Sequence, residues 1–483
     1  MSNPTTSDAD QAAIATRDPG RAIRWALASL SLSILLSSLG TSIANVGLPT
    51  LAQVFNASFQ HVQWVVLAYL LAITTLIVSA GRLGDIVGRR RLLLAGIALF
   101  TLASVLCGMA PTLWPLVAAR ALQGLGAALM MALTMAFVGE TVPKERTGSA
   151  MGLLGTMSAV GTALGPSLGG VLIAWLGWRA IFFVNLPLGI VAFVLAYRYL
   201  PPDRGERKAE AGGFDRLGTL LLALALTAYA LAMTLHPGGG RSGFGLPNIG
   251  LLLLAAAGGG LFVFVESKAA SPLIRLAMFR DRALSASLAT SALVATVMMA
   301  TLVVGPFYLA RALGLEAAVV GLVLAAGPCV VALTGVPAGR IADRFGAQRM
   351  TVAGLTAMAA GCFVLFMLST ALGIPGYLAP IVVITVGYAL FQTANNTAVM
   401  KDIRPDQRGV ISGMLNLSRN LGLVTGASVM GAVFAFAAAT GDVATAQPEA
   451  VAGGMQITFA VAGMLILLAL GISLGSRTSI RKV

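Results

Sequence analysis

The sequence predicts an all-α membrane protein in which two similar six-helix bundles are joined, with two further helices inserted between them. Three observations lead to this prediction: an apolar composition, a series of membrane-length apolar segments and a repeated cassette. Hydrophobic residues make up 57% of the 483 positions and charged residues only 10%, whereas an ordinary soluble domain is about 25% charged. A chain with so little polar surface is suited to a lipid bilayer.

Membrane-length segments run along the whole chain. The sequence contains fourteen apolar windows, and about 20 such residues can cross a hydrocarbon core about 30 Å thick. The windows are centred near residues 36, 70, 101, 126, 161, 190, 226, 257, 298, 327, 361, 387, 424 and 464. The first 22 residues are polar and lack the apolar core of a cleavable signal peptide, so we expect a cytosolic tail.

The chain repeats itself at an interval of about half its length. The cassette Gly81–Arg90 (GRLGDIVGRR) returns 258 residues later as Gly339–Gln348 (GRIADRFGAQ). Four glycines also recur at a shared offset of 261 residues: Gly152, Gly161, Gly165 and Gly170 match Gly413, Gly422, Gly426 and Gly431. Two parallel repeats related by an axis along the membrane normal produce this pattern.

The repeat and the hydropathy together predict the organisation of the chain. The expected units are a cytoplasmic tail over 1–22, a bundle over 23–205, a linker with two extra helices over 206–284, a second bundle over 285–476 and a cytoplasmic tail over 477–483. The two extra segments have few internal polar residues, so we expect them to face lipid. A segment from Ser271 alternates bulky apolar and basic residues and is expected to lie at the membrane interface.

The basic excess of the chain predicts its orientation. If both termini are cytoplasmic, 27 of the 32 Lys and Arg residues fall in inner loops and tails. The outer loops hold only Arg179, Arg241 and Arg311. This distribution follows the positive-inside rule. The net charge of +14 therefore reflects membrane topology, not a nucleic-acid partner.

The repeated cassette has the composition of a turn between membrane helices. Gly81 and Gly88 permit tight backbone turns, and Asp85 can accept from a helix N-terminus or pair with Arg. A loop that only fixes orientation would need neither feature at fixed spacing, so we favour a conformational latch. Its residues are Gly81, Asp85, Gly88, Arg89 and Arg90, with Gly339, Asp343 and Arg344 in the second copy. The second copy has lost two basic positions, so the first is expected to be the working latch.

These segments resemble the signatures of one family. GRLGDIVGRRR is similar to signature A of the major facilitator superfamily, ARALQGLGAA around Arg120 to signature B, and GTALGPSLGG from Gly161 to the antiporter signature C. WRAIFFVNLPLG from Trp178, the PLIRLAMFRDR segment and the helix count resemble the fourteen-helix drug:proton antiporter branch. The resemblance covers nearly the whole chain and implies the major facilitator fold and proton-linked drug efflux.

The signature C segment has a pattern of small residues. Gly161, Gly165 and Gly169 stand at i, i+4 and i+8 and form a flat stripe where a neighbouring helix can approach closely. Pro166 removes one backbone hydrogen bond and bends the helix. The resemblance implies that this bend, with Gly170, belongs to the antiport machinery. Ordinary tight packing remains the alternative, because Gly and Pro are common in membrane helices.

Polar residues recur at helical spacing in three of the predicted helices. Their presence in both halves favours a shared central cavity, although such side chains can also hold helices together. The candidate cavity residues are Thr41, Ser42 and Asn45 near the first window, Tyr388, Gln392, Asn395 and Asn396 in the twelfth, and Asn416, Arg419 and Asn420 in the thirteenth.

Two arginines fall inside predicted helices, where a charge without a partner costs roughly 2.5–3.5 kcal/mol or more. Arg120 is followed by Gln123 one turn later, and Arg419 lies between Asn416 and Asn420. The resemblance to signature B implies that Arg120, with Gln123, shapes the field of the cavity. The alternative is an Arg satisfied by carbonyls and amides between helices.

One position departs from the drug:proton branch. The branch carries an acidic residue in its first helix where this chain reads LGTSIANVGLP from Leu39, so Gly40 replaces the carboxylate. All 18 acidic residues lie in tails, in loops or within a turn of a predicted helix end. A buried carboxylate is a natural reversible proton carrier. Proton coupling must therefore use a boundary acid such as Glu140, or be absent.

We therefore expect a secondary active exporter of drugs or other small amphipathic molecules, driven by the proton gradient, in a bacterial cytoplasmic membrane. The alternative is an exporter of one neutral or anionic metabolite or lipid-like molecule without conventional proton antiport. The expected partners are the substrate, protons as a candidate coupling ion and lipid, with no cofactor, metal or nucleic acid and a monomer as the working unit. An enzyme is disfavoured because the elements of a catalytic site are missing. ATP-driven transport is disfavoured because no GxxxxGK[ST] loop occurs.

Overall fold

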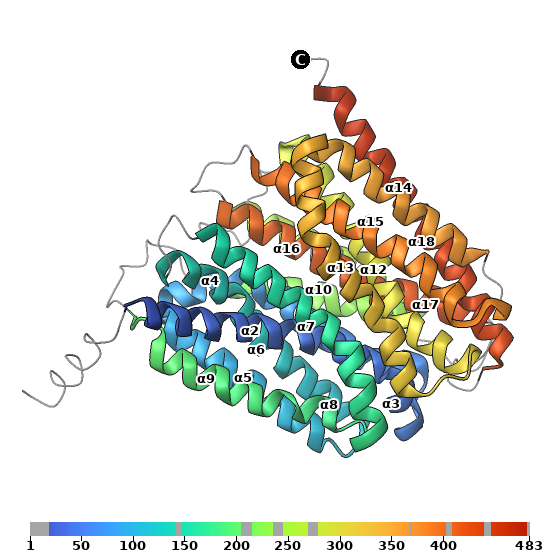
Figure 1. Cartoon of the computed structure of the whole chain (residues 1–483), viewed down its shortest axis with the longest axis horizontal. Coiled ribbons are helices and arrows are strands. Elements are labelled where there is room, and N and C mark those ends of the chain that lie inside the picture. Colours follow the sequence, from blue (N-terminus) through green and yellow to red (C-terminus); the bar gives the residue numbers. More distant parts are fainter. Residues whose placement is uncertain are drawn as a thin grey trace, which may run out of the picture.

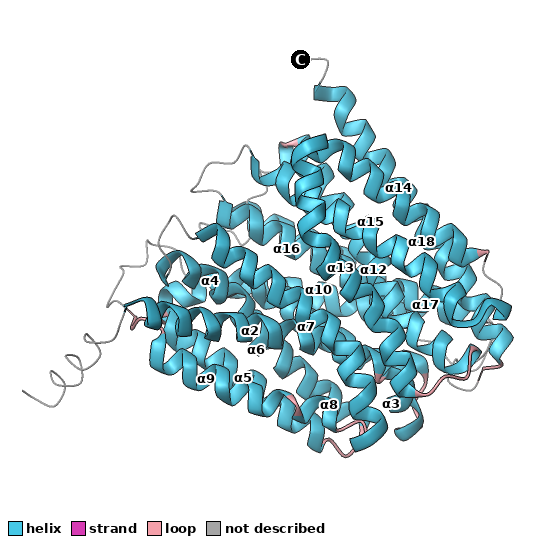
Figure 2. Cartoon of the chain, viewed as in Figure 1, coloured by secondary structure: helices cyan, strands magenta, loops and turns pink. Residues whose placement is uncertain are grey.

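The computed structural model describes residues 19–141, 147–203, 215–234, 245–268, 279–367, 370–401, 408–438 and 446–480. This part of the chain is helical and contains no strand (Figure 2). Thirteen of its helices are long and apolar enough to cross a membrane. A shorter apolar stretch, Ala317–Val331, begins the longer helix α13 (Ala317–Phe345). The expected all-α, multi-span architecture is confirmed, whereas the total of fourteen spans and the cytoplasmic termini stay predictions.

The first bundle contains the helices between Pro19 and Tyr199. They are α2 (Pro19–Val46), α3 (Leu48–Val54), α4 (Phe59–Val87), α5 (Arg89–Met109), α6 (Leu113–Thr141), α7 (Thr147–Leu176), α8 (Ala180–Phe183) and α9 (Asn185–Tyr199). Helix α2 packs against α7 and α9, and α6 packs against α4 and α5. Pro49 stands in the first turn of α3, where its missing N–H leaves no helical hydrogen bond unmade.

The second bundle lies beside the first in Figure 1, where it runs from yellow to red. Its elements are α12 (Arg282–Phe307), η3 (Tyr308–Ala312), α13, α14 (Ala347–Phe366), η4 (Thr370–Leu372), α15 (Gly373–Lys401), α16 (Arg408–Thr425), η5 (Gly426–Met430), α17 (Gly431–Ala437) and α18 (Pro448–Ile480). Helix α14 packs against α15 and α18, and α12 packs against α16 and α18. The π-helical turn η3 ends the helix begun by α12, and η5 joins α16 to α17. Such π-turns are frequent at functional sites.

The two inserted helices differ in their surroundings. Helix α11 (Leu246–Lys268) is exposed over most of its surface, as expected for a lipid-facing element. Helix α10 (Arg216–Thr234) packs against α4 and also against η5, so it touches both bundles. Trp64 Nε1 of α4 donates to Thr234 Oγ1 of α10 at 3.1 Å. Only α11 therefore fits the expected lipid-facing role, because α10 packs against elements of both bundles.

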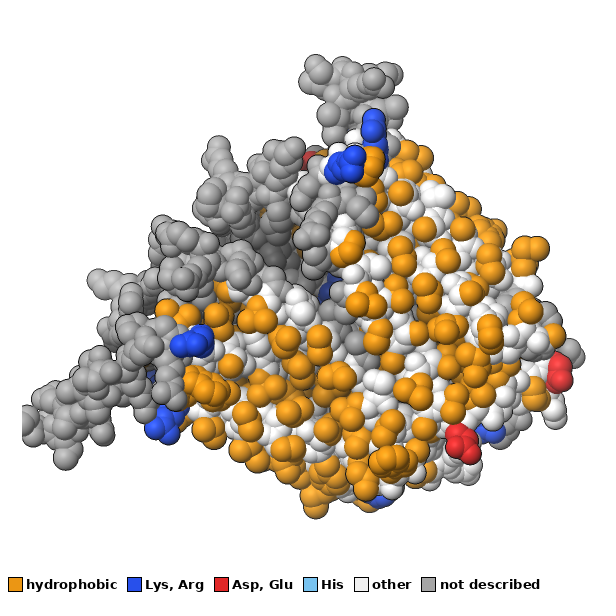
Figure 3. Space-filling model, in the orientation of Figure 1, with side chains coloured by type: hydrophobic (Ala, Val, Ile, Leu, Met, Phe, Trp, Pro, Cys, Tyr) orange, Lys and Arg blue, Asp and Glu red, His pale blue; other side chains and the backbone are white. Residues whose placement is uncertain are grey.

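Apolar side chains cover the visible flank of both bundles, and charged side chains lie toward the edges of this view (Figure 3). This distribution suits a bilayer around the middle of the molecule. The expected tails 1–22 and 477–483 are partly helical, since α2 begins at Pro19 and α18 ends at Ile480. Residues 1–18, 481–483 and most of the expected interfacial segment, 269–278, lie outside the described residues.

Candidate functional site

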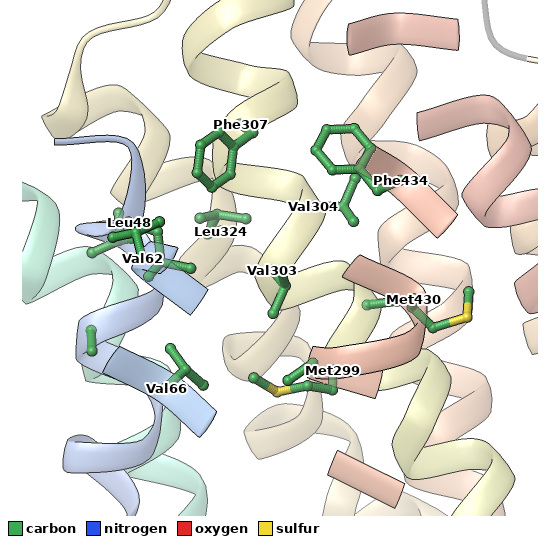
Figure 4. Close-up of a cluster of buried hydrophobic side chains, with 14 of the residues drawn as sticks. Leu48, Val62, Val66, Met299, Val303, Val304, Phe307, Leu324, Met430 and Phe434 are labelled. Carbon is green, nitrogen blue, oxygen red and sulfur yellow. The ribbon is translucent and has the colours of Figure 1, made fainter. Parts of the chain in front are cut away.

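The two bundles meet through aromatic side chains at the end that carries α3. Phe59 of α4 packs against Phe307 of α12 and Phe434 of α17, with ring centroids 4.8 Å and 5.4 Å apart. All three rings are fully buried. We name these three residues the aromatic gate. Figure 4 shows Phe307 and Phe434 with aliphatic side chains from both bundles, among them Leu48, Val62, Val66, Val303 and Met299. Apolar contact therefore fills the space between the bundles at this end.

Two further contacts join the bundles. Gln63 Nε2 of α4 donates to the main-chain oxygen of Ala427 in η5 at 2.8 Å. Helices α7 and α13 touch backbone to backbone: a Cβ on Gly170 would lie 2.6 Å from the Ala317 oxygen. A Cβ on Gly321 would lie 2.4 Å from the Pro166 oxygen. Gly170 of signature C thus sits where the two bundles cross.

The remaining glycines of signature C lie inside the first bundle. A Cβ on Gly161 would lie 2.6 Å from the oxygen of Leu35, and one on Gly165 would lie 1.9 Å from Ser42 Oγ. Gly169 approaches Val46 in the same way. The stripe therefore holds α7 against α2, and Pro166 lies within this helix. Helix α7 packs on α2 through the stripe and on α13 through Gly170.

The polar stripe of α2 faces α7 over most of its length. Ser38 Oγ and Ser158 Oγ share a hydrogen bond of 2.8 Å, and Ser42 Oγ donates to the Gly161 oxygen at 3.4 Å. Ser42 and Asn45 are at most 1% exposed. These two residues therefore differ from the cavity expectation. The glycine stripe of α7 covers Ser42, and Asn45 Nδ2 donates to the Thr41 oxygen of its own helix at 3.0 Å. Thr41 is half-buried and remains a candidate.

Arg120 of α6 is fully buried and surrounded by protein groups. Its Nε donates to the Val65 oxygen at 2.8 Å, and its Nη2 donates to the Gly40 oxygen at 3.0 Å. Its Nη1 donates to Gln123 Oε1. The guanidinium also lies 4.1 Å from the centroid of the Tyr69 ring, a cation–π geometry. Arg120 is thus satisfied by groups from three helices, α2, α4 and its own.

Arg120 and Gln123 therefore lie inside the first bundle and do not line a cavity in this structure. Gln123 is also fully buried. Its Nε2 donates to Ser104 Oγ of α5 at 2.7 Å, so the hydrogen-bond network extends to a fourth helix. Gly40 completes the site, since a Cβ there would lie 2.9 Å from Tyr69 Oη. The alternative reading of Arg120, an arginine held by carbonyls and amides between helices, describes what is seen.

The polar residues of α15 divide into two groups. Tyr388 and Gln392 are half-buried, and neither makes a hydrogen bond within the described part of the chain. Asn395 is buried, and its Nδ2 donates to the Ser287 oxygen of α12 at 3.4 Å. Asn396 is exposed. Tyr388 and Gln392 thus have free polar atoms available to a substrate, while Asn395 holds two helices together.

Arg419 and Asn420 of α16 contrast with Arg120. Arg419 is half-buried, and its Nε is inaccessible and has no acceptor among the described residues. Asn420 is 3% exposed, and its Nδ2 likewise lacks an acceptor. Asn416 is half-buried on the same helix and is hydrogen-bonded or otherwise engaged. The surface in Figure 3 is hollowed between the bundles, with a basic side chain visible inside the hollow.

The turn of the first cassette lies at Gly88, between α4 and α5. Gly88 has a φ of 106°, which favours glycine. Asp203 Oδ1 accepts from the Arg90 N–H at 2.8 Å and its Oδ2 from the Arg91 N–H at 3.2 Å. The carboxylate therefore caps the N-terminus of α5. Sequence reasoning missed Asp203, because the contact joins residues more than a hundred positions apart and follows no spacing rule.

The other cassette residues have varied positions. Arg90 Nη2 donates to the main-chain oxygen of Tyr197 in α9. The guanidinium carbon of Arg90 lies 5.3 Å from the centroid of the Tyr197 ring. Arg89 is partly buried and has an interaction partner. Gly81 lies within α4, with no atom within 4 Å of its would-be Cβ, so it does not form the expected turn.

The second cassette repeats the turn. Gly346, with a φ of 86°, separates α13 from α14 and corresponds to Gly88. Gly339 falls within α13, as Gly81 falls within α4. Arg344 is exposed and lies 5.5 Å from the ring centroid of Phe345. The side chains of Asp85 and Asp343, and the surroundings of Gly339, lie outside the described part of the structure.

Comparisons with known proteins agree with this architecture. Residues 30–427 match the model of the Major Facilitator Superfamily. Multidrug resistance protein Stp of Mycobacterium tuberculosis is 33% identical over 418 residues, covering 85% of this chain and 75% of its own. Riboflavin transporter RibZ of Clostridioides difficile is 29% identical over 413 residues, covering 85% and 88%. The crystal structure of a bacterial homolog of the human lysosomal transporter Spinster has a TM-score of 0.70 at 15% identity, covering 95% and 98%.

These relatives are transporters and not enzymes. The repeated bundles, the membrane-length helices and the family match over residues 30–427 lead to one assignment. The chain is a multi-pass membrane transporter that belongs to the major facilitator superfamily.

Proposed function

We propose that this protein is a secondary active exporter of drugs or other small amphipathic molecules and works by alternating access. The observation that carries the proposal is the aromatic gate, in which Phe59 of one bundle packs between Phe307 and Phe434 of the other. Two rigid bundles that meet through apolar side chains at one end can part there and close elsewhere. The relatives named for multidrug resistance support export of foreign compounds.

The positive-inside distribution supports an outer-face location for the aromatic gate. The structure then corresponds to a state closed to the outside. The cassette turn at Gly88, held by Asp203, lies at the opposite, cytoplasmic end of α4. We assign to it the role of an inner latch that favours one arrangement of the bundles.

The substrate pathway runs between the bundles. Its best candidates are the half-buried polar residues Thr41, Tyr388, Gln392 and Arg419. Arg419 Nε has no acceptor among the described residues, whereas Thr41 Oγ1 donates to the Ser37 oxygen of its own helix. A cavity of this kind binds amphipathic molecules through apolar walls and a few polar groups that fix orientation. The protein acts as a monomer in a bacterial cytoplasmic membrane, since one chain contains both bundles.

The proton gradient is the proposed driving force, as signature C and the drug:proton branch imply. A second candidate rests on one observation: Gly40 stands where the branch has its carboxylate, and its carbonyl accepts from Arg120. That alternative is an exporter of one neutral or anionic metabolite or lipid-like molecule without conventional proton antiport. The relative named as a riboflavin transporter supports a single-substrate role.

Efflux from energised everted vesicles tests the proposal. The vesicles come from a bacterial host lacking its main drug pumps, and accumulation of amphipathic dyes is compared with empty-vector vesicles. Gly170→Leu should abolish accumulation, because its side chain would collide with the Ala317 oxygen and separate α7 from α13. Gly471→Leu is the matched control, since no atom lies within 4 Å of its would-be Cβ. Equal accumulation with Gly170→Leu and the unmodified protein contradicts alternating access at this crossing.

A further inference from the structure

We infer that Arg419 and Asn420 form a binding subsite for the acidic group of an anionic amphipathic substrate, such as a carboxylate or sulfonate. The inference rests on the proposed function and names its substrate class. Its basis is the difference between the two intramembrane arginines. Arg120 makes three hydrogen bonds with protein acceptors, whereas Arg419 makes none within the described chain.

Arg419 lies within the candidate membrane span Met414–Ala437. It is five residues from the start of that span, which corresponds to about 8 Å along a helix axis. A guanidinium at such depth faces a partner, a substrate path or water, because isolation in hydrocarbon costs several kcal/mol. The described acidic side chains are Asp203, Asp215, Glu266, Asp281, Glu316 and Glu449, and none pairs with Arg419.

One face of α16 is fixed against α12. Ser418 Oγ donates to the Leu288 oxygen of α12, and the Gly422 oxygen accepts from Thr296 Oγ1 at 3.1 Å. These two residues of α16 stand at i and i+4 and so share a face. Substrate therefore has no access to this side of the helix.

A neighbouring face of α16 packs against the inserted helices. Met414, Leu417 and Leu421 cluster there with Leu222 of α10 and Phe262 of α11. Successive helical residues turn by about 100°. Arg419 consequently leaves the helix about 60–100° from Gly422 and Ser418 of the first face, and Asn420 about 60–100° from Leu417 and Leu421 of the second. Helix α16 also packs against α4 of the first bundle, so we place the remaining side at the boundary between the bundles.

The donors of this pair match an anion. Arg419 Nε and Asn420 Nδ2 are both inaccessible and without a protein acceptor, and a buried donor left unsatisfied costs about 1–3 kcal/mol. A guanidinium offers a planar fork that fits carboxylate or sulfonate oxygens. Two unsatisfied donors on adjacent residues, one of them 3% exposed, thus specify a ligand that brings acceptor oxygens and negative charge.

An anionic substrate also offers a driving force that does not depend on a proton-carrying carboxylate, which this chain lacks at Gly40. Moving one negative charge out of a cell with a negative interior releases about 2.3 kcal/mol per 100 mV of membrane potential. This force adds to any proton gradient and needs no carboxylate in the membrane. The Gly40 carbonyl that accepts from Arg120 is then compatible with active export.

Binding of three probes with one pyrene ring and one four-carbon arm tests the inference. The probes are 1-pyrenebutyrate, neutral 1-pyrenebutanol and the cationic pyrenebutyl-trimethylammonium ion. Energy transfer from the five tryptophans to pyrene reports binding to the full chain in nanodiscs, with empty nanodiscs subtracted. The unmodified protein should bind pyrenebutyrate about tenfold more tightly than the cation, equivalent to about 1.4 kcal/mol.

The variants assign that preference to the pair. Arg419→Gln should weaken pyrenebutyrate binding about tenfold and leave pyrenebutanol within about twofold. Asn420→Asp places a carboxylate beside Arg419 and should remove the anion preference even if Arg419→Gln folds poorly. Arg311→Gln is the control, because Arg311 is half-buried like Arg419 but lies in η3, and it should change nothing.

Three outcomes overturn the inference: no binding of pyrenebutyrate, no anion preference in the unmodified protein, or a preference that survives both Arg419→Gln and Asn420→Asp. None of these touches the proposed function, which is judged by accumulation in vesicles. Conversely, the protein could bind anions selectively and yet accumulate neither the dyes nor pyrenebutyrate in vesicles. The subsite would then be supported and the proposed export function would be wrong.

Discussion

Arg120 Nη2 donates to the main-chain oxygen of Gly40, with 3.0 Å between the two atoms. The contact lies in the interior of the first bundle, and the position that could have carried a carboxylate contributes only a carbonyl. A carbonyl is a dipole that does not titrate, so the pair holds α2 to α6 without offering a proton site. The charge of Arg120 is therefore structural in this chain.

The first prediction concerns Arg120→Gln. Loss of charged hydrogen bonds to the Val65 and Gly40 oxygens should lower the free energy of unfolding by about 1.5–3 kcal/mol for each bond. Thermal unfolding of the purified protein measures this. The charge preference in probe binding should stay unchanged, in contrast to Arg419→Gln. If the Arg120→Gln protein is stable and its charge preference changes, Arg120 contacts the substrate and the structural assignment is wrong.

Gly40→Ala should destabilise the first bundle. Its Cβ would lie 2.9 Å from Tyr69 Oη and 3.2 Å from the Phe100 ring, and overpacking of this kind costs about 1–3 kcal/mol. Adding Tyr69→Phe removes the nearer atom, so the double variant should lose less stability than the sum of the single variants. Gly471→Ala, where no atom lies within 4 Å, serves as the control and should not destabilise. Additive losses would show that Tyr69 Oη is not the obstacle.

Asp203→Ala should slow transport more than its effect on stability explains. Removing the cap of α5 costs about 1 kcal/mol and frees the cassette turn at Gly88. Asp281 is the matched control, because its Oδ1 caps α12 by accepting from the Ala283 N–H at 2.8 Å and has no contact with the cassette. Asp281→Ala should lose similar stability in thermal unfolding but keep its accumulation rate in vesicles. If transport slows equally in both variants, Asp203 acts only as a helix cap and the latch role is wrong.

Phe59→Ala should shift the bundles toward the state open at the gate. The ring packs against Phe307 and Phe434 only while the gate is closed, and truncation of a buried Phe costs about 3–5 kcal/mol. Nitroxide labels at Asn56 and Leu315, on opposite bundles near the gate, report the separation by pulsed electron resonance. The distance distribution should gain a longer component. Phe264→Ala, at an exposed position of α11, should leave the distribution unchanged.

Much of the architecture was predictable because it depends on local and periodic properties. Apolar windows of membrane length gave most of the helices, and the repeat at Gly81 and Gly339 gave the two bundles. The glycines of signature C marked close helix contacts before any partner was known. The structure added the partners, which are α2 for Gly165 and α13 for Gly170.

The candidate site was predictable only in part, because helical spacing does not say which face a helix buries. Ser42 and Arg419 belong to stripes of the same period, yet one is covered by α7 and the other is half-buried and unpaired. Long-range partners were also invisible. Asp203 caps a helix that begins more than a hundred residues earlier, and α10 joins the line between the bundles.

Transport in proteoliposomes with and without an imposed pH gradient tests the central claim most directly. The purified chain is reconstituted, and uptake of cationic, neutral and anionic pyrene probes is followed with the gradient applied, absent, or collapsed by a protonophore. The account predicts that the gradient accelerates transport of at least one probe and that the protonophore abolishes the acceleration. Identical rates under all three conditions for every probe would contradict proton-driven export.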